Sequence, residues 1–164
     1  MDELKKGLDI ALHGKMADDT VAEIKRIIDS WGLRLPEVEP MVLDFGLGKF
    51  REIGETEFWI ANEVRAGYCG KFLFVFDGQT CPKHMHKAKL ETFYIVRGSV
   101  KMLYDGREFA MREGDVLKVE LEKYHRFTGI GECLLLEVSA PSIIDDNYFE
   151  DVCIPIGGNF EGRK

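Results

Sequence analysis

Hydrophobic residues in the first 35 positions follow the pattern of an α-helix. In the segment DDTVAEIKRIIDSWG they recur every three or four residues, the spacing that places side chains on one helix face. The apolar stripe consists of Val21, Ile24, Ile28 and Trp31. A helix with a single apolar face must pack on another surface, most simply the outside of a sheet or a partner subunit.

The ends of this helix also have sequence signals. Thr20, followed three positions later by Glu23, has the pattern of a capping box and predicts the start of the helix. Gly32 can close the other end, where a residue in the left-handed conformation is common. We therefore expect a helical extension over residues 1–40, which ends in the connector LPEVEP.

From about residue 41 the pattern changes to short β-rich runs separated by turns that contain glycine. Asp105-Gly106 is a typical two-residue hairpin turn of type I′. The runs cover residues 71–78, 92–98, 99–106, 107–111, 115–121, 125–129 and 133–139. Many short strands at intervals of roughly ten residues favour a sandwich or barrel over alternating strand–helix units. The pattern predicts one all-β domain over residues 41–164.

Composition narrows the possible partners. A net charge of −7 disfavours nucleic acids and anionic membranes, because both attract basic surfaces. No apolar run approaches the ~18 residues of a membrane helix, and the N-terminus lacks a signal-peptide pattern. The four cysteines are widely spaced, which favours reduced thiols over a disulfide framework or a zinc site. We therefore expect a cytoplasmic protein with neither nucleic-acid nor membrane partners.

Three of the four histidines lie within 42 residues of one another. His84 and His86 occupy alternate positions, which point to the same side of a strand. Glu91 begins the next predicted run, and His125 opens a later one. Imidazole and carboxylate groups are ligands for Mn, Fe, Co, Ni or Zn. Three histidines and one glutamate leave coordination positions open, which indicates a catalytic metal site rather than a closed structural one.

The spacing of these residues resembles the first sequence motif of the cupin superfamily. Gly78, His84, His86, Glu91 and Gly98 occur at the spacing of that motif without a gap. The resemblance covers roughly residues 72–140. It implies a small jelly-roll β-barrel that holds a metal inside one end.

The second cupin motif is less complete. Gly114 and His125 have its separation, but Glu120 and Glu122 replace its usual proline and glycine. Gly129 replaces its usual asparagine. These departures loosen the turn before His125 without removing the ligand.

Two segments, HMHKAKLE and EVSAPSIIDDNYFED, resemble the cupin D-lyxose isomerases and their sugar-isomerase relatives. The resemblance implies that Lys89 and Glu137 act in proton transfer. It also implies that a divalent metal is bound, with manganese expected and cobalt, iron, nickel or zinc as alternatives. Its ligands would be His84, His86, Glu91 and His125. The glycine triplet that commonly follows the family's metal glutamate is replaced here by YIVRGSV, so the substrate is left open.

The implied reaction interconverts an aldose and a ketose, such as D-lyxose and D-xylulose or D-mannose and D-fructose. If the C-terminal segment folds over the barrel mouth, Asp145, Asp146 and Asn147 could grip sugar hydroxyls. Taken without the resemblance, Lys89 could instead be a solvated loop residue and Glu137 an outward-facing strand residue. The acidic pair could likewise be a solvated turn.

Two other functions fit the same ligand set. An iron-dependent cupin oxygenase would use the same four residues, and a non-catalytic sugar-binding cupin would bind without turnover. The expected partner is a sugar, and the expected assembly is a homodimer. Amphipathic helices and exposed sheet edges favour pairing, and two-fold symmetry is its commonest form.

Overall fold

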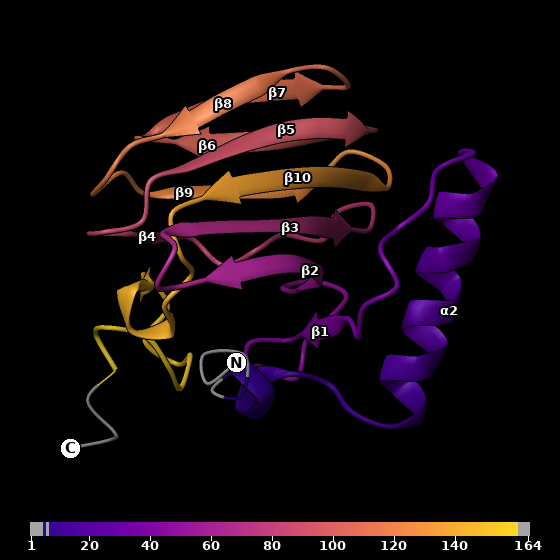
Figure 1. Cartoon of the computed structure of the whole chain (residues 1–164), viewed down its shortest axis with the longest axis horizontal. Helices are drawn as coiled ribbons and strands as arrows, with labels where there is room; N and C mark the ends of the chain where they lie inside the picture. Colours follow the sequence, from indigo (N-terminus) through magenta and orange to yellow (C-terminus); the bar gives the residue numbers. More distant parts are fainter. Residues whose placement is uncertain (1–4, 6, 161–164) are drawn as a thin grey trace.

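The computed structural model describes residues 5 and 7–160, whose strands form two antiparallel sheets that face each other (Figure 1). One sheet has six strands in the order β1-β2-β3-β10-β5-β8, and the other has five in the order β11-β4-β9-β6-β7. Neighbouring strands come from distant parts of the sequence, as in a jelly roll. The prediction of an all-β jelly-roll barrel with a helical N-terminal segment is confirmed.

The strands of the six-stranded sheet are β1 (Met41–Leu43), β2 (Glu55–Glu63), β3 (Tyr68–Val75), β10 (Cys133–Ser139), β5 (Glu91–Arg97) and β8 (Val116–Val119). Those of the five-stranded sheet are β11 (Tyr148–Phe149), β4 (His84–Met85), β9 (His125–Gly129), β6 (Ser99–Tyr104) and β7 (Arg107–Arg112). The remaining elements are the 3-10 helices η1 (Leu8–Ile10) and η2 (Ile144–Asp146) and the α-helix α2 (Lys15–Ser30).

Side-chain alternation gives the six-stranded sheet two apolar faces. In β10, Leu135 points into the core between the sheets, whereas its neighbour Leu134 points outward to a second core. The inner core includes Val75, Phe93, Ile95, Met102, Phe127 and Leu135. Glu137 continues the inward row of β10 toward one end of the barrel, where it lines a cavity.

Helix α2 packs on the outer face of the six-stranded sheet, at the right of Figure 1. Ile24 and Ile28 are fully buried there against Phe74 and Leu134. The predicted apolar stripe therefore packs on the sheet, which is one of the two surfaces expected for it. Before α2, the backbone of Leu12 bonds to β1 (N–O distance 2.7 Å), which joins the N-terminal segment to the sheet edge.

The predicted start of the helix is wrong. Helix α2 begins at Lys15 after Gly14, and Thr20 is buried within it rather than capping it. Its end is as predicted, because Gly32 has a φ of +72° and its N–H bonds to the carbonyl of Asp29. Leu33 N–H bonds to Ile28 O, which completes a Schellman motif.

Four strands have no counterpart among the predicted runs: β1, β2, β4 and β11. The inward positions at the start of β2 hold Glu55 and Glu57, so charge replaces the expected apolar alternation. Strands β4 and β11 each have two residues, too few to give a periodic signal. Their pairing of Phe149 with His84 brings the C-terminal segment to the barrel end.

Two turns contain residues in the left-handed backbone region. Asp105 and Gly106 both have positive φ, +48° and +79°, as the predicted type I′ turn requires. Glu122 also has a positive φ, +60°, at the position where the second cupin motif usually has glycine. Its N–H donates to His86 O at 2.7 Å, so this strained turn is tied to a predicted metal ligand.

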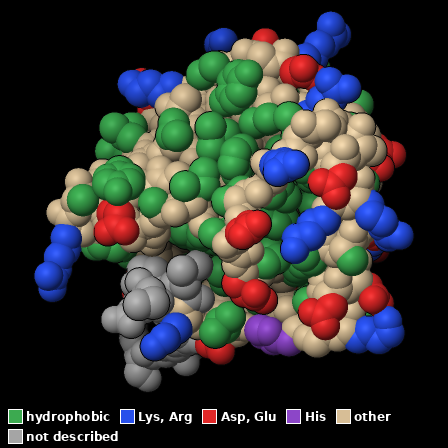
Figure 2. Space-filling view, turned by 45° about the vertical axis from the view of Figure 1, so that its right-hand side comes forward, with side chains coloured by type: hydrophobic (Ala, Val, Ile, Leu, Met, Phe, Trp, Pro, Cys, Tyr) green, Lys and Arg blue, Asp and Glu red, His purple; other side chains and the backbone are tan. Residues whose placement is uncertain are grey.

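Within the described residues, no helix combines the length and hydrophobicity that a bilayer crossing needs. The cysteines are free: Cys69, Cys81 and Cys133 are buried, and Cys153 is exposed. Hydrophobic side chains nevertheless remain at the surface and gather on the face that Figure 2 presents. On the outer face of the six-stranded sheet these include Tyr94, Val116 and Val138.

Replacing Glu122 with glycine should stabilise the protein. Glycine removes the left-handed strain of the present residue, at the smaller cost of a more flexible unfolded chain. We expect the free energy of unfolding, measured in urea, to rise by about 0.5–1 kcal/mol. The same change at Glu120, which lies outside the left-handed region, should give no gain. A loss of stability in Glu122→Gly would contradict this account of the turn.

Candidate metal centre and active site

The structure brings the four predicted metal ligands together between the two sheets. His84 on β4 lies directly opposite His125 on β9 in the five-stranded sheet. His86 follows the end of β4, and Glu91 opens β5 in the other sheet. One ligand atom from each of the four residues lies within 4.8 Å of all the others. The predicted cluster is therefore compact enough to surround a single ion.

Each histidine of the cluster has a fixed tautomer. In every case the Nδ1 atom lies at hydrogen-bond distance from a backbone carbonyl oxygen, which can only accept, so Nδ1 donates. The contacts are His84 to Pro82 O (2.8 Å), His86 to Asp146 O (3.0 Å) and His125 to Lys123 O (3.0 Å). The three Nε2 lone pairs are therefore available to a metal, with the backbone orienting each ring.

The cluster contains buried polar atoms that lack hydrogen-bond partners. These atoms are Nε2 of His86, Nε2 of His125 and Oε1 of Glu91. His125 Nε2 lies 2.7 Å from Glu91 Oε1, and His86 Nε2 lies 3.6 Å from it, but neither contact has hydrogen-bond geometry. Buried polar groups are normally satisfied, so three unpartnered atoms this close together fit a site that binds a cation.

The charge states of the ligands suit a metal as well. Burial, helped by His125, holds the pKa of His84 well below its usual value, and burial lowers that of His86 to about 4. Burial alone would raise the pKa of Glu91, but Lys89 and His125 outweigh it and hold it well below its usual value. Neutral imidazoles and an ionised carboxylate are the forms that bind divalent metals.

Lys89 and Glu137 lie beside the metal cluster and are buried. Only 4% of Lys89 and 2% of Glu137 are exposed, which excludes a solvated lysine and an outward-facing glutamate. Lys89 Nζ lies 2.7 Å from Glu91 Oε2 and 2.5 Å from Glu137 Oε1. A single ammonium group thus bridges a predicted metal ligand and the predicted proton-transfer carboxylate.

The lysines keep Glu137 ionised. Burial would raise the pKa of Glu137, but Lys71 and Lys89 together outweigh it and lower the pKa below its usual value. Burial likewise opposes the charge of Lys89, yet Glu137 and Glu91 raise its pKa. Carboxylate and ammonium are therefore both charged at neutral pH.

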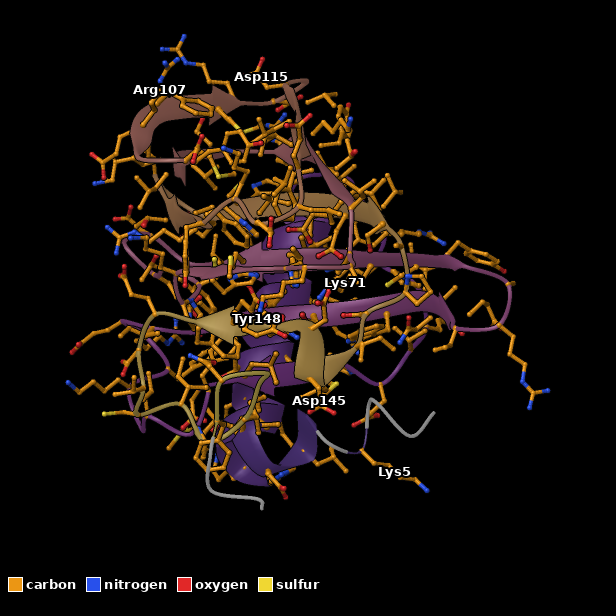
Figure 3. All side chains as sticks on the ribbon, turned by 90° about the vertical axis from the view of Figure 1, so that its left-hand side faces the viewer. Lys5, Lys71, Arg107, Asp115, Asp145 and Tyr148 are labelled. Atoms are coloured by element: carbon orange, nitrogen blue, oxygen red, sulfur yellow. The ribbon has the colours of Figure 1, made fainter. Side chains whose placement is uncertain are left out.

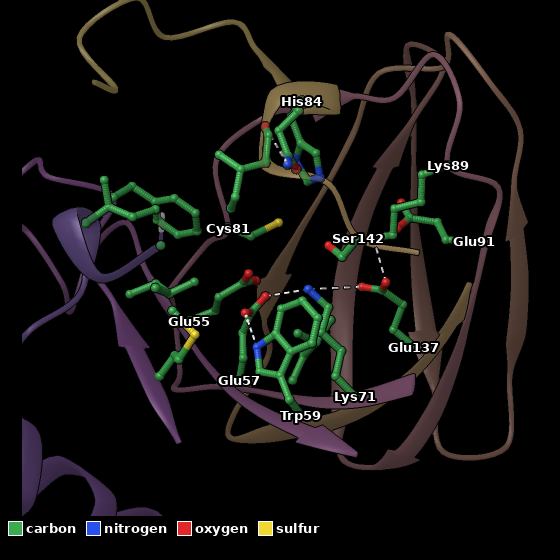
Figure 4. A pocket seen from close by; sticks show the side chains of 18 of the residues that line it. Glu55, Glu57, Trp59, Lys71, Cys81, His84, Lys89, Glu91, Glu137 and Ser142 are labelled. Carbon is green, nitrogen blue, oxygen red and sulfur yellow. Dashed lines mark hydrogen bonds and ion pairs between the residues drawn. The ribbon is translucent and has the colours of Figure 1, made fainter. Parts of the chain in front are cut away.

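Further buried charged residues, which the sequence did not predict, lie next to Glu137 in the cavity wall (Figure 4). Lys71 on β3 lies directly opposite Glu137 in the sheet and hydrogen-bonds to Glu57 on β2. Trp59 Nε1 donates to the other oxygen of Glu57 at 2.8 Å. Burial, with the nearby Glu57, raises the pKa of Glu55 well above its usual value.

One signal in the sequence could have identified Lys71. Lys71 begins the apolar run KFLFV, just as Glu137 interrupts the apolar run CLLLEVS. A charge in an otherwise apolar strand is costly to bury without a partner, so two such charges in neighbouring strands suggest a pair. Glu57 offered no such signal, because the hydrophobic pattern did not predict β2.

A cavity connects these groups with the metal cluster. Its polar wall includes His84, Lys89, Glu91, Glu137, Lys71, Glu57, Glu55, Ser142 and Asn147. Its apolar wall includes Ile10, Met41, Leu43, Phe45, Phe93 and Phe149. Convergent polar groups in an otherwise apolar cavity are typical of a small-molecule site.

The C-terminal segment lies at this end of the barrel, where β11 pairs with β4 and where Figure 3 labels Asp145 and Tyr148. The carboxylate of Asp146 accepts hydrogen bonds from the backbone N–H groups of residues 87–89, with N–O distances of 2.9–3.1 Å. Asn147 lines the cavity and donates to the carbonyls of residues 143 and 144. Asp145 is exposed. Of the three predicted hydroxyl-binding residues, the structure thus brings Asn147 to the cavity wall.

Comparison with protein families matches residues 72–139 to the cupin domain. The D-lyxose/D-mannose isomerase of Thermosediminibacter oceani is 38% identical over 73 residues, which cover 41% of this chain and 39% of that protein. The D-lyxose ketol-isomerase of Cohnella laeviribosi is 37% identical over 102 residues, which cover 57% of this chain and 54% of that protein. The chain thus spans about half or less of the length of these curated relatives.

Solved structures extend the likeness in fold to most of the chain. The L-ribose isomerase of Acinetobacter sp. DL28 in complex with L-ribose has a TM-score of 0.73 at 16% identity, covering 88% of this chain and 95% of that one. The L-ribose isomerase of Cellulomonas parahominis has a TM-score of 0.67 at 16% identity, covering 86% and 93%. At such identity the likeness establishes the fold alone. Residues 72–139 form a cupin domain, in a chain that resembles the cupin-type sugar isomerases.

Proposed function

We propose that this protein is a metal-dependent aldose–ketose isomerase of the D-lyxose/D-xylulose or D-mannose/D-fructose type. The observation that carries the proposal is the carboxyl group of Glu137, buried in the cavity and bridged by Lys89 to Glu91. The names of the two curated relatives support the same reaction class.

The metal would be held by His84, His86, Glu91 and His125, whose unpartnered atoms fit a divalent cation. We expect manganese, with cobalt, iron, nickel and zinc as alternatives that the same ligands accept. When bound, such a cation would act as a Lewis acid that polarises the sugar carbonyl.

Glu137 is the proposed base. An aldose and its 2-ketose differ in the position of one carbon-bound hydrogen and one hydroxyl proton. Glu137 would take the proton from C2 of the aldose and return it to C1, while Lys89 would give a proton to O1 and take one from O2, so the net reaction consumes no proton. A base must be ionised before the reaction, and the two lysines favour that state.

Lys89 is the proposed partner of the sugar oxygens. Its ammonium group has three donors, and two of them are engaged by Glu91 and Glu137. The third could donate to a sugar oxygen as negative charge develops there. Asp146 would fix the loop that carries Lys89, through its bonds to the backbone N–H groups of residues 87–89.

Asn147 is the residue of the C-terminal segment best placed to contact a sugar hydroxyl, because it lines the cavity. Asp146 would join this segment to the loop of residues 87–89. The cytoplasm is the proposed location of the protein. Its four cysteines are free thiols, three of them buried, and thiols stay reduced in the cytoplasm.

A homodimer is the proposed assembly. The exposed apolar residues Tyr94, Val116 and Val138 on the outer face of the six-stranded sheet support association of two copies. Sedimentation velocity at micromolar concentration should give the mass of two chains. A monomer mass across that range would contradict the proposal.

The isomerase proposal predicts that the protein reconstituted with manganese converts D-lyxose to D-xylulose or D-mannose to D-fructose. Replacing Glu137 with glutamine removes the base and keeps its shape, so turnover should fall by at least about a thousandfold. Metal content should stay unchanged, because Glu137 is not a ligand. Chromatography of the products and elemental analysis of the protein measure the two quantities.

Other outcomes of the same assay would indicate a different function or a different base. Oxygen consumption with iron and a substrate would indicate an oxygenase, since isomerisation uses no oxygen. Sugar binding without conversion by any of the five metals would indicate a binding module. Full activity in Glu137→Gln would show that another group is the base.

The metal proposal has its own test. His125→Ala removes a fully buried predicted ligand, so affinity for manganese should fall by at least about a hundredfold. His13→Ala is the matched control, because His13 is exposed and bonds only to Leu8 O among the contacts seen. Titration of the metal-free proteins by calorimetry measures both. Equal affinities in the two variants would exclude the proposed site.

A further inference from the structure

The two carboxylate oxygens of Glu137 have different surroundings. Oε1 lies 2.5 Å from Lys89 Nζ and accepts the hydroxyl of Ser139 at 2.8 Å. Oε2 faces Lys71 Nζ at 3.5 Å, which is longer than an ordinary charge-assisted hydrogen bond. Oε2 is therefore the oxygen that is free to accept a proton from a substrate.

Lys71 is kept at this distance by groups on its other side. Its ammonium group hydrogen-bonds to Glu57 Oε1 and lies 4.8 Å from the centre of the Trp59 ring. Trp59 in turn donates its indole N–H to Glu57 Oε2 at 2.8 Å, which fixes the carboxylate. Glu57 and Trp59 lie two positions apart on β2, so they share the inward face of the strand. Figure 4 shows this line from Trp59 through Glu57 and Lys71 to Glu137.

Stability alone does not account for this arrangement. Side chains of Lys71 and Glu57 are 7% and 6% exposed, and a buried ion pair is often no more stable than apolar residues of similar size. The pair lies in the wall of the same cavity as the metal cluster, next to the proposed base. A role at the active site explains why charge is retained there.

We propose that Glu57 is a positioning residue, which holds Lys71 back from Glu137 so that Oε2 of Glu137 stays open to the sugar. This inference rests on the proposed function of Glu137 as the base. Lys71 then contributes its charge to the site without occupying the oxygen that reacts.

Loss of the Glu57 charge would release Lys71. Among the carboxylates of the described residues, Glu137 would be the one left within 4.0 Å of Lys71 Nζ, with its Oε2 at 3.5 Å. A shift of less than about 1 Å would bring Lys71 Nζ to the ~2.8 Å of a charge-assisted hydrogen bond with Oε2. That bond would occupy the reactive oxygen and make it a weaker base.

The test compares Glu57→Gln with the double variant Glu57→Gln/Lys71→Met. In the single variant we expect kcat to fall about tenfold or more, with KM for the sugar nearly unchanged, because Oε2 is occupied. In the double variant no lysine is left to occupy Oε2, so kcat should recover most of the loss. Replacing both members of the pair also leaves no unpaired buried charge, which favours folding.

Glu63→Gln, at the exposed end of the same strand, is the matched control and should keep full activity. Thermal unfolding and metal content of each variant separate a loss of structure from a loss of turnover. A double variant as slow as Glu57→Gln, or slower, would overturn the inference, because a merely structural pair predicts additive damage.

A crystal structure of Glu57→Gln gives a readout that does not depend on activity. We expect Lys71 Nζ within about 3 Å of Glu137 Oε2. An unchanged separation would overturn the inference even if the wild-type protein is an isomerase. If the wild-type protein converts no sugar, the proposed function fails, and this distance still decides whether Glu57 restrains Lys71.

Discussion

A line of buried charges with alternating sign determines the arrangement of the candidate site. It runs from Glu57 through Lys71, Glu137 and Lys89 to Glu91, and a divalent cation bound at Glu91 would continue the alternation. Each member offsets the cost of burying its neighbours, so removing one leaves an uncompensated charge in the barrel. The line ties the proposed base to the predicted metal ligands, so residues from four strands and a loop form one connected group.

The groups that would do the chemistry and the groups that hold them come from different parts of the chain. The four predicted metal ligands, Lys89 and Glu137 all lie within residues 72–139, which match the cupin domain. Glu57 and Lys71 precede that domain, and Asp146 follows it. Asp146 fixes the loop before β5, while β2 supplies the carboxylate that pairs with Lys71. The segments on either side of residues 72–139 thus supply groups that hold the candidate site in place.

The sequence predicted the cluster of candidate metal ligands because most of its signal is local. His84, His86 and Glu91 lie within eight residues, and alternation together with one hairpin brings them together. Glu57 was missed because inward charges on β2 disrupt the very periodicity that identifies a strand. The contact of Asp146 with residues 87–89 spans nearly 60 positions, and only the tertiary fold reveals it. The start of α2 was misplaced because Thr20 has capping chemistry but lies on the buried face of the helix.

The most direct test of this account is a crystal structure of Glu137→Gln grown with manganese and a sugar that the wild-type protein converts. The account predicts one cation among His84, His86, Glu91 and His125. It also predicts that the side chain at position 137 lies within about 3.5 Å of the C1–C2 pair of the sugar. A sugar bound with its reacting carbons away from position 137, or a cation held by other residues, would contradict it.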